Sequence, residues 1–366
     1  MNMPSAKKML LGDVVRFGNG KSIKPGGVGR YLVFGSNGII GGCDEFRHEN
    51  GVIIGRVGAY CGAVVYCPSK FWASDNTLVA YPANGQFDTK FLFYMLSDAK
   101  LSRYAGGAAQ PLVTQTVLKQ VEVRVPSLPI QQRIAGILSA YDELIENSQR
   151  RIKILETMAR GLYREWFVHF RFPGHENHPR VASALGEIPL GWEVRTVEEI
   201  VKRIPVGKKY DQKTVSPIGT VPVFDQGKTG IIGYHDDQPG VGATANAPVI
   251  VFANHTCYQR LIHFPFSAIQ NVLPFVPHPL VARNIYWLHW ATNGLVVFND
   301  YKGHWPEFAA KPLVVPSQAV CNQFGNFAAP ICRQLLMLER AIENLRRTRD
   351  LLLPRLLSGQ INVEAP

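Results

Sequence analysis

The chain has 366 residues, 46% of them apolar, which is enough for two domains with ordinary cores and argues against disorder throughout. Its longest apolar runs fall well short of the roughly 18 residues that a membrane span needs, and the N-terminus lacks a signal-peptide core. The six cysteines form no Cys-x-x-Cys pair, which argues against a zinc ribbon and favours reduced thiols. We therefore expect a cytoplasmic protein without redox chemistry.

The net charge of +11 comes from 39 basic and 28 acidic residues and is carried by two separate parts of the chain. Residues 1–129 hold 14 Lys and Arg against 8 Asp and Glu, and residues 200–317 hold 10 against 6. The stretch from Pro173 to Glu199 is acidic. Two basic segments favour a polyanion such as DNA, whose phosphates bind cations with release of counterions. A surface charge that serves only solubility is the alternative.

The segment from about Met9 to Pro129 is rich in glycine and in short runs of β-type residues. We expect strands at 51–55, 62–66, 77–81 and 120–125, with a short helix at 89–96. Pro126 and Pro129 then interrupt the strand pattern, and proline is tolerated in the first turn of a helix. A long helix is therefore predicted to begin there.

From Ile130 to about Phe167, apolar residues recur at heptad spacing, for example Ile134, Tyr141 and Leu155. A stripe over roughly 38 residues, about 57 Å of helix, is typical of one strand of a coiled coil. A second copy near the C-terminus, with Ile331, Leu338, Leu345 and Leu352 on one line, supplies a partner helix. Arg349 interrupts its neighbouring apolar line, and Pro354 is expected to end or kink the helix. Two independent amphipathic helices, each packed on its own domain, are the alternative.

The chain repeats itself internally. The tripeptide Ile-Glu-Asn stands at 145–147 and again at 342–344, a shift of about 197 residues that also lays Ile134 on Ile331. A weaker echo joins residues 34–41 to residues 224–233. The link from Phe172 to Trp192 is predicted to be a turn-rich connector. Two copies of a globular unit plus a long helix indicate a pseudo-symmetric protein suited to a two-part ligand.

Candidate DNA contacts are chosen by residue type, because Arg, Lys, Asn and Gln read base edges while Lys, Arg, Ser and Thr bind phosphates. Those of the first globular segment lie in or near polar or glycine-rich turns and are Lys21, Lys24, Ser36, Asn37, Arg56, Arg103, Gln110 and Gln115. Those of the second are Lys208, Lys209, Lys213, Gln226, Lys228, Asn254, His255, Tyr258, Arg260 and Lys302. An ordinary solvated role is about as plausible for each. Arg56 and the pair Asn254-His255 stand out because each follows an apolar strand at a similar place in its repeat.

Other constellations are weaker. The spacing of His169, His175 and His178 would not bring the three side chains together around a metal ion. For a second group, His255, Cys257 and His263, ordinary packing is favoured over zinc binding. The aromatic residues near the end of the first helix follow helical spacing and are expected to anchor the coiled coil or a partner surface: Tyr163, Trp166, Phe167 and Phe170.

The helical phrases resemble a known family. Residues 128–138, Leu-Pro-Ile-Gln-Gln-Arg-Ile-Ala-Gly-Ile-Leu, followed by Asp142-Glu-Leu-Ile-Glu-Asn147, are similar to the central spacer helix of type I restriction-modification specificity subunits. Residues 166–174 resemble the end of that spacer, and residues 351–361 resemble the end of the family's C-terminal helix. Residues 74–77 and 106–112 resemble phrases of its target recognition domains. The second helix departs from the first at its start, where residues 329–333 replace the Pro-x-Gln-Gln-Arg-Ile pattern.

The resemblance implies an α+β fold with two β-rich target recognition domains separated by a pair of long antiparallel coiled-coil helices, related by a pseudo-twofold repeat. The implied parts are target recognition domain 1 at 1–129, a central spacer helix at 130–172, a connector at 173–199, target recognition domain 2 at 200–317 and a C-terminal spacer helix at 318–366. It further implies a non-catalytic, DNA-binding subunit that reads a bipartite target. Two modification (methyltransferase) subunits would dock on the helices, and restriction subunits could join them. S-adenosylmethionine, ATP and magnesium are expected on those partners, and no cofactor is expected in this chain.

Two other classes of function remain open from the residues alone. A self-standing methyltransferase or nuclease with a duplicated recognition domain would need a catalytic or cofactor motif, and we find neither an Asn/Asp-Pro-Pro-Tyr/Phe motif nor a Gly-x-x-x-x-Gly-Lys-Ser/Thr phosphate loop. A protein-only scaffold would not need two basic globular segments.

Overall fold

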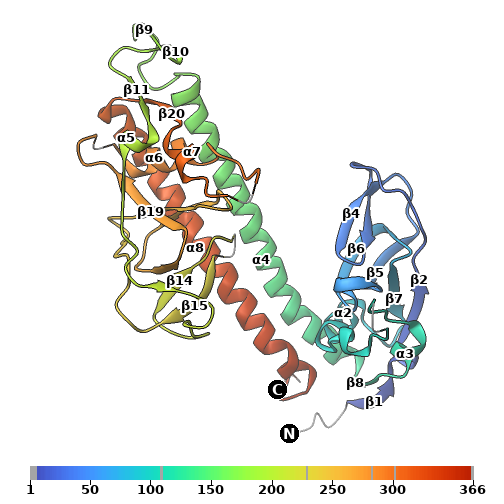
Figure 1. Cartoon of the computed structure of the whole chain (residues 1–366). Helices are drawn as coiled ribbons and strands as arrows, with labels where there is room; N and C mark the ends of the chain where they lie inside the picture. The colour runs from blue at the N-terminus through green and yellow to red at the C-terminus, as the bar shows by residue number, and fades with distance from the viewer. Residues whose placement is uncertain (1–5, 108–109, 228–229, 282, 301, 364–366) are drawn as a thin grey trace. The chain divides into compact units, whose positions relative to one another are not determined.

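The computed structural model describes residues 6–107, 110–227, 230–281, 283–300 and 302–363. The chain divides into two compact units, the first made of Met1–Gln149 with Arg340–Pro366 and the second of Arg150–Glu339. Two long helices, α4 (Leu128–Tyr163) and α8 (Gln318–Leu357), contribute one part to each unit, as can be followed in Figure 1.

The first unit is built on a six-stranded sheet in the order β2-β7-β5-β6-β3-β4. Neighbouring strands are antiparallel except that β3 runs parallel to β6. The strands are β2 (Val15–Asn19), β3 (Tyr31–Gly35), β4 (Gly38–Cys43), β5 (His48–Gly55), β6 (Val64–Ala73) and β7 (Thr77–Pro82). A separate pair joins β1 (Lys7–Leu10) to β8 (Glu122–Val125). The short helices are α1 (Leu11–Val14), α2 (Thr89–Asp98), α3 (Gln115–Lys119) and the 3₁₀ turns η1 (Gly58–Tyr60) and η2 (Leu101–Tyr104).

The core of the first unit joins the sheet to both long helices. Apolar side chains of β5, β7 and α2 pack with Ile134 and Leu138 of α4 and with Leu356 of α8. The two helices run antiparallel here, since the Arg133 side chain donates to the Val363 carbonyl while Asp142 pairs with Arg349. The start of α4 and the end of α8 are therefore part of the same hydrophobic core as the sheet.

The second unit contains two four-stranded sheets, β12-β19-β16-β17 and β13-β18-β14-β15. The first is antiparallel, whereas β18 runs parallel to both β13 and β14 in the second. Their strands are β12 (Val201–Arg203), β13 (Lys209–Tyr210), β14 (Val221–Phe224), β15 (Ile231–His235), β16 (Val249–Ala253), β17 (Gln259–Ile262), β18 (Ser267–Ile269) and β19 (Val272–Pro277). Two further pairs are β9 (Arg180–Ser183) with β10 (Gly186–Pro189) and β11 (Glu193–Thr196) with β20 (Pro312–Val315). The helices are α5 (Val197–Ile200), α6 (Ile285–Thr292), α7 (Trp305–Ala309) and the π-helical turn η3 (Arg164–Val168) that follows α4.

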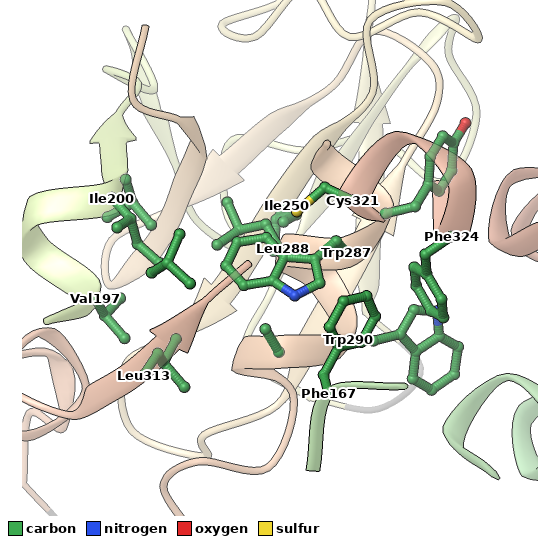
Figure 2. Close-up of a cluster of buried hydrophobic side chains, with 14 of the residues drawn as sticks. Phe167, Val197, Ile200, Ile250, Trp287, Leu288, Trp290, Leu313, Cys321 and Phe324 are labelled. Carbon is green, nitrogen blue, oxygen red and sulfur yellow. The ribbon is translucent and has the colours of Figure 1, made fainter. Parts of the chain in front are cut away.

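The core of the second unit is rich in aromatic side chains. Trp287 of α6 is fully buried, and Figure 2 shows its indole among side chains from α5, η3, β16, β20 and α8. Phe167 contacts both Trp287 and Phe324 of α8, and Tyr163 and Trp166 also pack on Phe324. The aromatic residues that end the first helix therefore anchor it in this core.

The internal repeat is visible in the order of the elements. We call Lys7–Val125 the first repeat and Glu193–Val315 the second. Each opens with a strand that pairs with the repeat's last strand. Between them, each passes through a short helix, a series of paired strands, a capped helix and a second short helix, and one long helix then begins. The second repeat thus starts at Glu193, on the strand β11.

The register between the two long helices differs from the expected uniform shift of 197 residues. At the helix starts the N–H of Gln131 donates to the Ser127 carbonyl, and the N–H of Cys321 donates to the Ser317 carbonyl, which are 190 positions apart. Ile134 therefore corresponds to the equally buried Phe324 rather than to Ile331. Between that start and the Ile-Glu-Asn motif, α8 is seven residues longer than α4.

The second long helix begins at Gln318, the expected start of the C-terminal spacer, so residues 329–333 lie in its interior rather than at its start. It continues past Pro354 to Leu357, so Pro354 does not end it. The connector is not turns alone, because it contains the β9–β10 hairpin and buries Phe172, Ile188 and Trp192 in the core of the second unit. The expected strands and the expected short helix of the first repeat are all observed, with shifted ends. They are the strands predicted at 51–55, 62–66, 77–81 and 120–125 and the helix predicted at 89–96.

Within the described part of the chain, no helix is both long enough and apolar enough to cross a membrane. The six cysteines are free thiols.

Candidate nucleic-acid interface

In the first repeat, several loops meet around Arg56, the residue that follows β5. The backbone N–H of Arg56 donates to the carbonyl of Asn76 at 2.9 Å, and its carbonyl accepts from the N–H of Val113 at 3.0 Å. The Ser36 hydroxyl donates to the same Asn76 carbonyl at 2.6 Å and accepts from the N–H of Val57 at 3.3 Å. The turns after β3 and β6 and the loop before α3 are thereby fixed around one position.

The second repeat builds the same frame with other residues. Asn254 follows β16, and its N–H donates to the carbonyl of Asn271 at 2.9 Å while its carbonyl accepts from the N–H of His304 at 2.8 Å. The Gln226 side-chain carbonyl accepts from the N–H of His255 at 2.8 Å, as Ser36 does from Val57. The two repeats therefore present equivalent loop clusters, and Arg56 and Asn254 occupy equivalent positions.

The side chains at these two positions are used differently. The Asn254 carboxamide oxygen accepts from the N–H of Trp305 at 2.8 Å, so this side chain holds the start of α7. Arg56 is partly buried, and its Nε is buried without a hydrogen-bond partner among the described residues. The first cluster thus offers a free guanidinium where the second has an amide already engaged.

The other candidates of the first repeat are spread over its loops. Lys21 and Lys24 are exposed in the segment between β2 and β3, and Asn37 and Gln110 are exposed in the β3–β4 turn and beside Pro111. Gln115 donates from Nε2 to the Asn19 carboxamide at 2.8 Å. Arg103 lies over the Tyr104 ring and donates to its hydroxyl at 2.9 Å, so its guanidinium is engaged within its own turn.

In the second repeat, most candidates gather at the loop cluster. Arg260 donates to the carbonyl of Gly227 at 2.7 Å and lies over the rings of Tyr258 and Phe224, which ties β17 to the turn after β14. Gly303 packs against the Asn254 amide, which puts the neighbouring exposed Lys302 beside the cluster. Lys228 lies outside the described residues.

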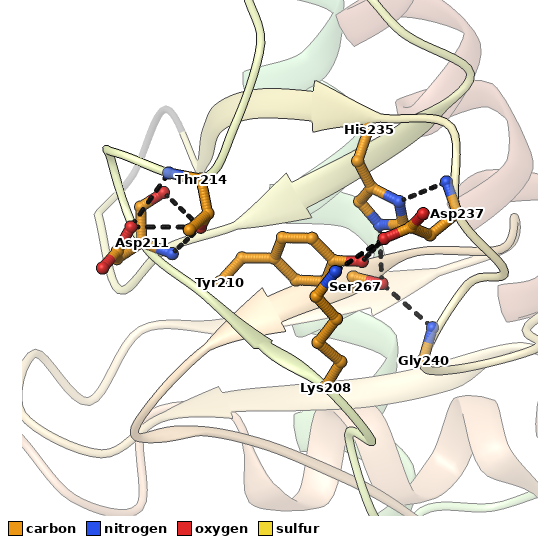
Figure 3. Close-up of polar contacts among 8 residues, drawn as sticks. All are labelled: Lys208, Tyr210, Asp211, Thr214, His235, Asp237, Gly240 and Ser267. Carbon is orange, nitrogen blue, oxygen red and sulfur yellow. Dashed lines mark hydrogen bonds and ion pairs between the residues drawn. The ribbon is translucent and has the colours of Figure 1, made fainter.

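Three lysines, Lys208, Lys209 and Lys213, form a second group in and beside β13. Figure 3 shows Lys208 donating to the Asp237 carboxylate at 2.7 Å, with the Tyr210 hydroxyl on the same oxygen at 3.1 Å. These two donors hold the pKa of Asp237 below its usual range. Tyr210 stacks on His235, whose Nε2 lies 2.9 Å from the Ser267 hydroxyl. Lys208 is therefore ion-paired within the chain, although its side chain is exposed, as are those of Lys209 and Lys213.

Sequence reasoning missed the residues that frame the clusters. Asn76 and Asn271 contribute backbone carbonyls, and Val113 and His304 contribute backbone N–H groups. A backbone group leaves no signal in residue type, so the element order of the two repeats was the available clue.

The structure does not favour a metal or a reactive thiol. Within the described ranges, no three His, Cys, Asp or Glu side chains gather as ligands for a metal ion. His255, Cys257 and His263 do not share one strand, because residues 254–258 form a turn with Cys257 at a φ of 58° before β17 begins. Burial raises the pKa of Cys321 and of Cys332 to about 12, which keeps both thiols protonated and unreactive.

Comparisons with known proteins agree on one family. Residues 5–157 match the family described as type I restriction modification DNA specificity domain. The MjaIX type I specificity subunit of Methanocaldococcus jannaschii is 24% identical over 75% of this chain and 70% of its own length. The EcoprrI specificity subunit of Escherichia coli is 30% identical over 42% of this chain and 40% of its own length. A solved type I restriction-modification S subunit from M. genitalium superposes with a TM-score of 0.67 at 16% identity, covering 98% of this chain and 97% of the other.

The fold, with two repeats that each continue into a long helix, is thus that of a solved S subunit over nearly the whole chain. Residues 5–157 thus match the specificity domain of this family, and the chain as a whole is similar to type I restriction-modification specificity subunits.

Proposed function

We propose that this chain gives a type I restriction-modification complex its DNA sequence specificity and that each repeat reads one part of a bipartite target. The observation that carries the proposal is the loop cluster that recurs in both repeats around different side chains, Arg56 in one and Asn254 in the other. Equivalent frames that present different side chains suit two different base sequences. The excess of basic residues in both repeats favours a DNA ligand.

The proposed partners are double-stranded DNA, two modification subunits on the long helices and, in a complex that also cleaves, restriction subunits. S-adenosylmethionine, ATP and magnesium are proposed to bind those partners, so that this chain selects the site and carries out no reaction. The similarity to type I specificity subunits supports this division of labour. A complex that acts on chromosomal DNA would work in the cytoplasm.

A self-standing methyltransferase or nuclease, the main alternative, has no support from the matched proteins, which are specificity subunits. Calorimetric titration of the purified chain with S-adenosylmethionine and incubation with plasmid DNA and magnesium test it directly. We expect neither binding nor cleavage. Either activity in the isolated chain would restore the enzyme alternative.

Methylation mapping tests the proposal itself. The chain is expressed in cells together with its modification subunit, and methylated adenines are located by long-read sequencing, with the chain omitted as the control. We expect a motif of two defined parts separated by unspecified bases, present only with the chain. A motif that is methylated equally well without the chain would contradict the proposal.

A further inference from the structure

Arg56 differs from the other arginines around it. In the first repeat, four arginines lie over aromatic rings that occupy their guanidinium groups: Arg16, Arg30, Arg47 and Arg103. Arg56 makes no such contact and no side-chain hydrogen bond or ion pair with the described residues, and its Nε is buried. A buried N–H donor without an acceptor costs free energy, and an acceptor on a bound ligand would offset that cost.

The backbone around Arg56 is rigid. Both its N–H and its carbonyl are hydrogen-bonded to neighbouring loops, and the N–H of Gly58 donates to the carbonyl of Pro111 at 3.1 Å. A Cβ on Gly55 would lie 2.5 Å from the Tyr60 carbonyl oxygen and 2.7 Å from that of Ser36, so only glycine fits before Arg56. Gly58, at a φ of 74°, closes the turn. The frame holds one long side chain in place and leaves its charged end unused.

We propose that Arg56 is the residue with which the first repeat recognises a guanine, by donating two hydrogen bonds to its major-groove edge. A guanidinium presents parallel N–H donors that match O6 and N7 of guanine, and this pair is the commonest specific contact between arginine and a base. The inference rests on the proposed function, because it assumes that the first repeat reads DNA. It adds the base and the residue that reads it.

The second repeat lacks this contact. In its equivalent residue, Asn254, the carboxamide oxygen accepts a hydrogen bond from the N–H of Trp305. The nearby Arg260 donates to the Gly227 carbonyl and lies over two aromatic rings. The guanine contact therefore belongs to the first repeat alone. The two parts of the target differ accordingly.

The test uses the full chain expressed with its modification subunit and maps methylated sites for wild type, Arg56→Ala and Arg56→Lys. Lysine keeps the charge but not the planar fork, so both variants should relax one G·C position in one part of the motif by about tenfold or more, leaving the other part unchanged. Arg47→Ala is the matched control, since it also removes an arginine of the first repeat, and should leave the motif intact.

The outcomes separate the inference from the proposed function. A wild-type chain that directs no motif overturns the proposed function. A wild-type split motif that both Arg56 variants leave unchanged overturns only the inference, as does relaxation at an A·T position. Equal weakening at all sites would mark a phosphate contact and would also overturn it. If Arg56→Ala does not fold, judged by circular dichroism, Arg56→Lys decides.

Discussion

Arg349 is a charged residue on the apolar side of α8, and its contacts explain why it stands there. In the sequence it only interrupts a heptad line of α8. In the first unit it donates to Asp142 of α4 at 2.6 Å, and the other oxygen of Asp142 accepts from the Tyr94 hydroxyl of α2 at 2.5 Å. One partly buried carboxylate thus joins three helices. Burial and the adjacent Asp142 carboxylate together raise the pKa of Tyr94, which keeps its hydroxyl protonated as the donor.

We expect Arg349 and Asp142 to be energetically coupled. Arg349→Met leaves the Asp142 carboxylate without its cation, whereas adding Asp142→Asn removes that charge and keeps an acceptor for Tyr94. A double-mutant cycle in urea denaturation should give a coupling free energy of about 1 kcal/mol, because both side chains are partly exposed. Arg347→Met, at an exposed position of the same helix, should cost almost nothing. A coupling of zero would show that the pair only fills space.

The lowered pKa of the buried His289 predicts how the stability of the second unit depends on pH. It is buried in α6, where burial first and then the nearby His263 and Arg160 lower its pKa to about 4. This pKa in the folded state is lower than the value of about 6.5 for a histidine in the unfolded chain. Such a histidine contributes its full stabilisation of the fold at pH values above about 6.5. The contribution is lost as pH falls from about 6.5 towards 4, since the unfolded chain binds the proton first.

The free energy of unfolding of the second unit should therefore drop by on the order of 2 kcal/mol between pH 7 and pH 4.5 because of this residue. Tryptophan fluorescence during denaturation reports it, since Trp287 and Trp290 neighbour the histidine. His289→Gln should flatten the pH dependence, while His169→Gln, at an exposed position, should not. An unchanged slope in His289→Gln would contradict the assignment.

The sequence singled out Arg56 and Asn254 as candidates, but it did not show whether their side chains are engaged by other residues. Both follow apolar strands, and that pattern is local. The partner of Asn254, Trp305, lies 51 positions away, and Lys208 meets Asp237 over 29 positions. Whether a polar side chain is free or engaged depends on such distant contacts, which no local pattern contains.

Among the elements, the long helices were the easiest to predict and their register the hardest. An apolar stripe over ten turns is a strong signal, whereas a heptad pattern shifted by seven residues matches itself. The seven extra residues of α8 were therefore invisible in the apolar spacing. Only the hydrogen bonds at the helix starts reveal that the two copies begin 190 positions apart.

Proline affected the strands and helices in different ways. Pro265 stands between β17 and β18, whereas Pro68 lies inside the continuous strand β6, beside an irregular pairing of β5 with β6. Because proline cannot donate to a ladder, each marks a break in the pairing. In α8, by contrast, Pro330 and Pro354 are carried within the helix, since packing on the second and the first core, respectively, holds the flanking turns.

Pro330 should make α8 less stable than it could be. It is exposed, so its replacement loses no packing, and it leaves one helical carbonyl without its N–H partner. Pro330→Ala should raise the free energy of unfolding by about 1 to 3 kcal/mol in urea denaturation. Gln334→Ala, also exposed, is the control and should change it by less than about 0.5 kcal/mol. A loss of stability in Pro330→Ala would mean that the proline shapes a bend on which the core depends.

At the scale of the whole molecule, each of the two basic segments, residues 1–129 and 200–317, covers most of one structural repeat. The sequence also indicated two copies of one unit. It could not show that the second copy starts at Glu193, because the opening strand β11 is only four residues long and pairs with β20 more than a hundred residues later. Short strands are defined by their partners rather than by their composition.

Charge also predicts a salt dependence for DNA binding by the assembled complex. The logarithm of the binding constant should fall linearly with the logarithm of the salt concentration, by about 0.9 for each phosphate contact. Lys24 is exposed, with no ion pair among the described residues, so Lys24→Ala should lower this slope by about one contact. Lys8→Ala should not, because Lys8 already pairs with Glu122 at 2.6 Å. Fluorescence anisotropy over a salt series measures both, and equal slopes for Lys24→Ala and wild type would remove Lys24 from the interface.

The most direct test of the central claim is to map methylated adenines in cells that express the modification subunit with either the complete chain or a chain lacking residues 200–317. If two repeats each read one part of the target, the complete chain directs a split motif, and the deletion removes the specificity of one part or abolishes methylation at that motif. An unsplit motif with the complete chain, or a split motif that the deletion leaves unchanged, would contradict the account.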